Sequence, residues 1–199
     1  ITGQDIPHQF PVDYYPVIGN DLRACIAYYR ERDPEMAAYG SVEQILAQAV
    51  AVKEEIYQEL TSQGLEAFEG IRELVETAKA RGLGVAIASS GRPEKIQHNL
   101  RSSGQDDLVP DELTVSAAYV KAGKPAPDVY LEALRRLSCS DASRVMVVED
   151  AVHGIHAAKG AGCFAVGIPN TLPRDRLEPH ADLVVDNAHE LVQILLKQA

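Results

Sequence analysis

The stretch Arg144–Gly162, RVMVVEDAVHGIHAAKGAG, joins an apolar run to a segment of small residues with helical spacing. The run Val145–Val148 predicts a buried strand, and the acidic residues Glu149 and Asp150 follow it directly. The N-terminus of a helix favours one negative charge, but two neighbouring carboxylates repel each other unless they share a cation. The pair therefore has two interpretations: a divalent metal site, or a single N-cap Asp150 beside a solvated Glu149.

Composition and charge narrow the classes of partner. Of the 199 residues, 46% are hydrophobic and 24% are charged, which is typical of a globular protein, and the net charge is −10. We expect such an acidic chain to bind neither nucleic acid nor a membrane surface, although a bound metal can admit an anionic substrate locally. The sequence has no apolar run long enough to span a bilayer.

The cysteine pattern bears on the compartment. Cys25, Cys139 and Cys163 are odd in number, are scattered and form no CxxC motif. They predict no disulfide framework, so we expect a reducing compartment, either the cytoplasm or an organelle stroma.

Residues 1–65 predict a helical unit. The segments 21–32 and 41–64 space their apolar residues as helices do, and no convincing strand pattern interrupts them. Ser41 and Gln44 have the spacing of a capping box at the start of the second helix.

Residues 66–199 predict an α/β unit in which helices and strands alternate. The expected strands lie within residues 83–91, 112–120, 144–150, 163–169 and 181–187. The expected helices lie within residues 70–82, 92–104, 126–139, 151–162 and 188–198. This alternation predicts right-handed crossovers and a parallel sheet covered by helices on both faces. In such a sheet the ligand lies at the carboxyl ends of the strands.

Two other strand ends carry polar groups. Ser89, Ser90, Gly91 and Arg92 follow the first predicted strand. A hydroxyl and backbone N–H groups at such a turn can hold a phosphate oxygen, but an ordinary helix N-cap serine gives the same pattern.

Lys124 is the third feature, in the segment KAGKPAPD. Pro125 and Pro127 stiffen the backbone around it, which favours a fixed positive charge over one more solvated surface lysine. A hydroxyl, an ammonium and two carboxylates at one edge of a sheet suit a phosphorylated substrate with Mg²⁺.

The segments AIASSG, KAGKPAPD and VMVVEDAVHGIHAAKGAG resemble motifs two, three and four of the haloacid dehalogenase (HAD) superfamily, in its β-phosphoglucomutase and phosphatase branch. The resemblance runs from about residue 65 to the end. It implies a Rossmann-like HAD core in residues 66–199, with residues 1–65 forming most of a helical cap.

The resemblance also implies roles for the residues singled out above. Ser89 and Lys124 would be catalytic groups that orient the phosphate, and Glu149 and Asp150 would bind Mg²⁺. The substrate-binding residues would be Ser90, Gly91 and Arg92, with Arg92 near a second phosphate group of the substrate.

The first motif of the superfamily, DxDx[TV], is absent from this sequence. The first aspartate of that motif is the nucleophile and forms an aspartyl-phosphate, and its strand lies in the middle of the sheet. The resemblance places the motif before Ile1, so we expect a truncated sequence that lacks the first core strand and is inactive as it stands. The competing hypothesis is a natural chain that lost the motif and serves as a non-catalytic binding module.

The resemblance, together with these residues, therefore implies a magnesium-dependent phosphatase for a small phosphorylated metabolite such as a sugar phosphate. A phosphomutase of the same branch is the alternative, because both reactions share the aspartyl-phosphate. The oligomeric state is left open. His153 and His156, three residues apart on one predicted helix, are compatible with a metal pair or are ordinary helix residues.

Overall fold

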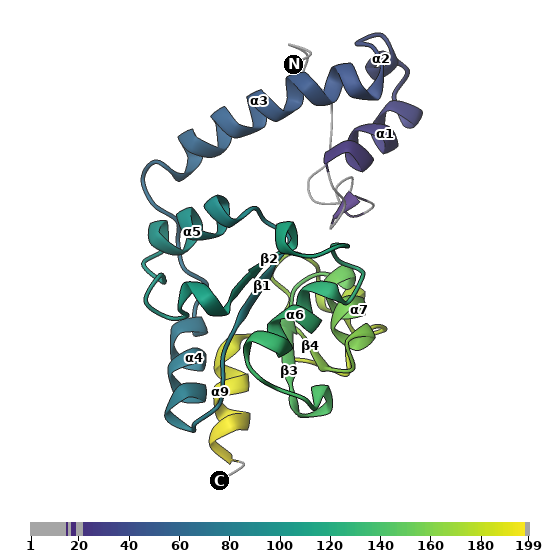
Figure 1. Ribbon diagram of the computed structural model, residues 1–199. Helices are drawn as coiled ribbons and strands as arrows, with labels where there is room; N and C mark the ends of the chain where they lie inside the picture. Colours follow the sequence, from purple (N-terminus) through teal and green to yellow (C-terminus); the bar gives the residue numbers. More distant parts are fainter. Residues whose placement is uncertain (1–14, 16, 19–21, 198–199) are drawn as a thin grey trace. The chain divides into compact units, whose positions relative to one another are not determined.

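The computed structural model describes residues 15, 17–18 and 22–197. They belong to two compact units, residues 1–63 and residues 64–199. Both units are drawn in Figure 1. The cap and core roles predicted for these two parts of the chain, divided at residue 65, stay predictions.

The described part of the first unit is helical. Its helices are α1 (Leu22–Arg32), α2 (Pro34–Ala37) and α3 (Val42–Thr61). The predicted capping box is confirmed: Ser41 Oγ accepts from the Gln44 N–H at 3.3 Å, and the Gln44 side chain accepts from the Ser41 N–H at 2.8 Å. Ile26 and Ile45 are buried where α1 packs against α3.

The second unit alternates strands and helices as predicted. The strands are β1 (Ile87–Ser89), β2 (Thr114–Ser116), β3 (Met146–Glu149), β4 (Phe164–Gly167) and β5 (Leu183–Val184). The helices are α4 (Ile71–Ala80), α5 (Pro93–Ser102), α6 (Asp128–Arg136), α7 (Val152–Gly160), α8 (Arg174–Leu177) and α9 (Ala188–Lys197). Three short 3-10 helices cover Asp111–Leu113, Ala117–Tyr119 and Ala142–Arg144.

All the strand pairs are parallel, which confirms the predicted α/β class. β1 pairs with β2, with Ala88 opposite Val115, and a separate sheet has the order β3-β4-β5, with Val148 opposite Val166. Among the described residues, β1 and β3 have no strand between them and do not pair with each other. The missing central strand predicted from the sequence therefore stays a prediction.

Helices cover both faces of the strands. On one side α4 packs against α9, and their apolar faces form a core with β4 (Figure 1). The most buried members of this core are Val166, Val185, Leu191 and Val192. On the other side α6 packs on β1 and β2, and α7 packs on β3 and β4.

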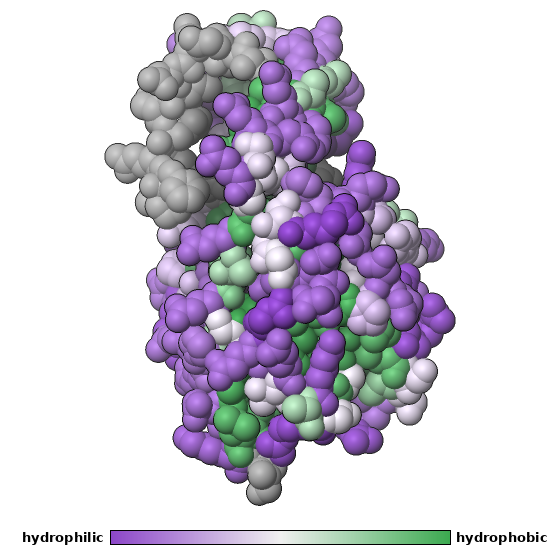
Figure 2. Space-filling view, turned by 90° about the vertical axis from the view of Figure 1, so that its left-hand side faces the viewer, coloured by the Kyte–Doolittle hydropathy of each residue, from purple (hydrophilic) through white to green (hydrophobic). Residues whose placement is uncertain are grey.

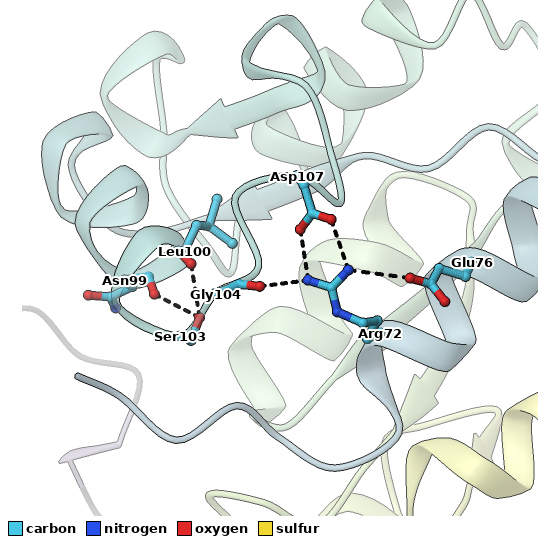
Figure 3. A network of polar contacts seen from close by, with 7 residues as sticks. All are labelled: Arg72, Glu76, Asn99, Leu100, Ser103, Gly104 and Asp107. Carbon is cyan, nitrogen blue, oxygen red and sulfur yellow. Dashed lines mark hydrogen bonds and ion pairs between the residues drawn. The ribbon is translucent and has the colours of Figure 1, made fainter.

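A polar network fixes the segment after α5 against α4, as Figure 3 shows. The Arg72 guanidinium donates to both carboxylate oxygens of Asp107, at 2.9 and 2.7 Å, and to the Gly104 carbonyl at 2.6 Å. The hydrogen bonds from Arg72 hold the pKa of Asp107 below its usual value. Because β1 lies between α4 and α5 in the chain, this network helps to fix the helices on both sides of that strand.

Among the described helices, none is both long and apolar enough to cross a membrane. The three cysteines form no disulfide within the described residues.

Candidate active site

The carboxyl ends of β1 and β3 open into one cavity of about 310 Å³. It is lined by Phe68, Ile71, Ala88, Ser89, Ser90, Lys124, Val148, Glu149, Asp150, Ile168 and Asn170. Five of the seven site residues predicted from the sequence are therefore brought together at the predicted edge. Gly91 and Arg92 follow in the chain but do not line this cavity, and the Arg92 side chain is exposed.

Lys124 reaches the cavity from the loop before α6. Its Nζ donates to Glu149 Oε1 and to the Ala88 carbonyl oxygen at 3.1 Å. The side chain is only 12% exposed, so the interpretation as a solvated surface lysine is wrong. The loop is closed by the Asp128 carboxylate, which accepts from the Ala122 N–H at 3.2 Å.

Glu149 is held by a second donor that the sequence reasoning missed. The Tyr130 hydroxyl, from α6, donates to the same Oε1 as Lys124, and the Lys124 ammonium lies 4.9 Å from the centre of the Tyr130 ring. Burial, with the nearby charge of Glu149, raises the pKa of Tyr130, so its hydroxyl stays protonated and donates. Glu149 is 11% exposed, which rules out a solvated carboxylate.

Gly154 makes room for this carboxylate and was also missed. A Cβ atom built at Gly154 would overlap with the carboxyl group of Glu149. The glycine costs α7 about 1 kcal/mol relative to alanine, so its place inside a helix needs a reason, and the close approach of Glu149 supplies one. The sequence did contain a signal of this close approach, because Gly154 lies inside a segment predicted to be helical.

Asp150 follows Glu149 and has a hydroxyl partner. Thr171 Oγ1 donates to its Oδ2, and Thr171 lies in the segment after β4. The N-cap of α7 is Ala151, and no side chain caps that helix. The alternative interpretation of Asp150 as a simple N-cap is therefore wrong.

Ser89 forms a local turn at the end of β1. Its Oγ accepts from the Gly91 N–H at 3.1 Å, while Ser116 Oγ, from β2, donates to the Gly91 carbonyl at 2.6 Å. The N-cap of α5 is Arg92, with no capping side chain. Ser89 is therefore not the N-cap of that helix, and its hydroxyl lies at the cavity.

The two carboxylates fit a magnesium site of the usual kind. Mg²⁺ is commonly bound by one or two protein carboxylates, with waters and substrate phosphate completing the octahedron. Both donors to Glu149 reach Oε1, and among the described residues none reaches Oε2. No group of three or more His, Cys, Asp or Glu residues gathers in the described part of the chain, so these two carboxylates are the acidic groups that it offers to a metal at this cavity.

The comparison with known families settles the classification. The model of the haloacid dehalogenase-like hydrolases matches residues 7–168. The chain belongs to this family. The predicted superfamily is confirmed, and the relatives place the chain in the β-phosphoglucomutase-like branch.

Three similar proteins illustrate that branch. The plasmid-encoded protein CbbY of Cupriavidus necator is 36% identical over 150 residues, covering 72% of this chain and 57% of the relative. The β-phosphoglucomutase of Mycobacterium tuberculosis is 37% identical over 147 residues, covering 69% of this chain and 54% of the relative. A crystal structure of CbbY from Rhodobacter sphaeroides with xylulose-1,5-bisphosphate matches with 28% identity and a TM-score of 0.63, covering 73% of this chain and 65% of that one. The chain thus spans about half the length of these two curated relatives.

Proposed function

We propose that this chain is part of a magnesium-dependent phosphatase that acts on a small phosphate monoester such as a sugar phosphate. The observation that carries the proposal is the cavity at the ends of β1 and β3, which combines Ser89, Lys124, Glu149 and Asp150. The sugar bisphosphate in the CbbY structure supports the substrate class. The cysteine pattern favours a reducing compartment, the cytoplasm or an organelle stroma.

Each of these residues has a task in the proposed reaction. The Ser89 hydroxyl donates to one phosphate oxygen, and Ser90, Gly91 and Arg92 contact the substrate beside it. The Lys124 ammonium has three N–H donors, of which Glu149 and Ala88 take two, so the third serves a phosphate oxygen. Glu149 and Asp150 hold Mg²⁺, which when bound neutralises charge on the transferring phosphoryl group.

The nucleophile in this proposal is an aspartate outside the 199 residues. The sequence contains no DxDx[TV] motif, and none of the described residues that line the cavity is a histidine that could act as a base for Ser89. The aspartate attacks phosphorus, the ester oxygen leaves, and water then cleaves the aspartyl-phosphate to release inorganic phosphate. We therefore expect the 199 residues alone to be inactive.

A phosphomutase is the second candidate, favoured by the relative that is a β-phosphoglucomutase. It uses the same aspartyl-phosphate but returns the phosphoryl group to a sugar hydroxyl instead of water. A non-catalytic module with this fold is the third possibility, and it predicts neither reaction.

The experiment measures release of inorganic phosphate from a panel of sugar phosphates with Mg²⁺, using the protein extended upstream to include the first motif. Lys124→Ala should reduce turnover by about 10²-fold or more, because it removes a charge that stabilises the transition state. Lys121→Ala, an exposed lysine three residues away, is the matched control and should leave turnover unchanged. Transfer to a second hydroxyl without phosphate release would indicate the mutase, and neither reaction over the whole panel would refute the proposal.

A further inference from the structure

A pair of histidines lies outside the candidate active site. His156 is on α7, and His180 is in the segment between α8 and β5. His156 Nε2 lies 3.1 Å from His180 Nδ1, with the ring centres 4.9 Å apart and the ring planes at 80°. Neither residue lines the cavity at the ends of β1 and β3.

The backbone of the pair is held by its surroundings. Lys159, one turn after His156, donates to the His180 carbonyl at 3.2 Å and to Asp182 Oδ1 at 2.7 Å. Asp182 Oδ2 in turn accepts from the Ala165 N–H at 2.8 Å, at the start of β4. The segment that carries His180 is therefore fastened to both α7 and β4, which keeps the two rings close.

The geometry of the pair matches two ligands of one metal ion. Two nitrogens that bind one tetrahedral Zn²⁺ at about 2.0–2.1 Å lie roughly 3.3 Å apart, close to the spacing of this pair. The ring centres lie 4.9 Å apart, which is less than two collinear rings with a nitrogen separation of 3.1 Å would require. The two rings therefore lie at an angle to each other. The separation of the two nitrogens is therefore that of two ligands of one ion.

The protonation state also suits a metal. Partial desolvation of this otherwise exposed ring, then the neighbouring His180, His153 and Lys159, lower the pKa of His156. Neutral imidazole is the form of histidine that binds metals. The charge of Lys159 is opposed by Asp182, which pairs with it at 2.7 Å.

We propose that His156 and His180 form a two-histidine site for a late first-row divalent metal ion, Zn²⁺ or Cu²⁺, distinct from the carboxylates Glu149 and Asp150. This inference goes beyond the proposed function and does not depend on it. No third His, Cys, Asp or Glu joins the pair within the described residues, so water completes the coordination. Cu²⁺ should bind more tightly than Zn²⁺, and Mg²⁺, which prefers oxygen ligands, should not compete.

The test is a Cu²⁺ titration of the 199-residue protein, followed by electron paramagnetic resonance and by competition with a chromophoric chelator. We expect one site with nitrogen ligands, whose affinity falls at least about tenfold in His156→Gln and in His180→Gln. Millimolar Mg²⁺ and Asp150→Asn should leave it unchanged. His98→Gln is the matched control, because His98 lies on α5, away from the pair, and contacts Ser102 Oγ.

The outcomes that overturn the site are equally definite. Equal Cu²⁺ affinity in wild type and in both variants would show that the pair is only an N–H···N hydrogen bond. Loss of Cu²⁺ binding in Asp150→Asn would assign the ion to the active-site carboxylates. His156 is exposed, so its variant should fold, and thermal melting of each variant verifies this.

Discussion

At the scale of single residues, the Glu149 carboxylate is the most constrained group in the site. Lys124 and Tyr130 donate to one of its oxygens, and Gly154 leaves the space that it occupies. The other oxygen has no donor among the described residues, which suits a carboxylate that also binds a metal. Two substitutions test this arrangement.

Gly154→Ala should displace Glu149, because the new Cβ would overlap with its carboxyl group. In the extended protein we expect a higher Mg²⁺ concentration for half-maximal phosphate release. Gly160→Ala on the same helix is the control, since its Cβ would meet Pro127 only at an ordinary 3.5 Å. Mg²⁺ titrations of the two variants that coincide would contradict the role given to Gly154.

Tyr130→Phe keeps the buried ring but removes one donor from a buried carboxylate. Without Mg²⁺, the free energy of unfolding should fall by about 1–3 kcal/mol, measured by urea denaturation. Tyr119→Phe is the control, because Tyr119 is 55% exposed and should cost far less. If both variants unfold alike, Tyr130 does not hold Glu149.

At the scale of elements, α4 and α9 pack along one side of the second unit and are also joined by a titratable group. His189 is on α9, and its Nδ1 lies 2.8 Å from Oε2 of Glu73 on α4. Its Nε2 lies 3.4 Å from Oε1 of Glu69, which precedes α4. These contacts raise the pKa of His189 above its ordinary value near 6.5. Protonated His189 therefore stabilises the folded state.

The contribution of His189 to the stability of the folded state should fall as the pH rises. Its stabilisation is fully present below the unfolded pKa near 6.5 and is lost as the pH rises through the raised folded value. Thermal melting of wild type and His189→Gln should therefore differ more at about pH 5.5 than at about pH 8.5. His189 and its partners are exposed, so the effect on stability should be small. A larger difference between the melting temperatures of the two proteins at the higher pH would contradict this prediction.

The features of the helices, strands and candidate site that the sequence predicted are those that show a pattern among residues close together in the chain. The capping box of Ser41 and Gln44 and the adjacent pair Glu149 and Asp150 are readable because their partners are near in the chain. Tyr130 meets Glu149 across 19 residues and Thr171 meets Asp150 across 21, and no local period reports such contacts. Helix α8 was not predicted because its four residues are too few for a helical period.

At the scale of the whole second unit, the site belongs to no single sheet. Ser89 ends β1 in one parallel sheet, and Glu149 ends β3 in the other. We expect the strand that carries the first motif to lie between them and to bring the nucleophile to the same cavity. Strand order depends on pairing between distant segments, so periodicity did not predict that β1 and β3 belong to separate sheets, whereas the resemblance, with its absent central strand, led us to expect such a gap.

The surface of this unit is mixed rather than uniformly polar. Figure 2 shows hydrophobic side chains among hydrophilic ones on the face that it presents. The exposed apolar residues include Met146 and Phe164, which lie opposite each other at the start of β3 and β4. Exposed apolar residues are common on globular proteins, so this adjacent pair does not by itself identify a partner.

Metal-assisted phosphoryl transfer is the reaction that we propose for this cavity. The most direct measurement is phosphate release from a sugar phosphate as Mg²⁺ is raised, by the extended protein and by its Asp150→Asn variant. We predict Mg²⁺-dependent turnover in the wild type and a loss of about 10²-fold or more in the variant, because the amide removes a charged metal ligand of nearly the same shape. Equal turnover and equal Mg²⁺ dependence in the two proteins would contradict the claim.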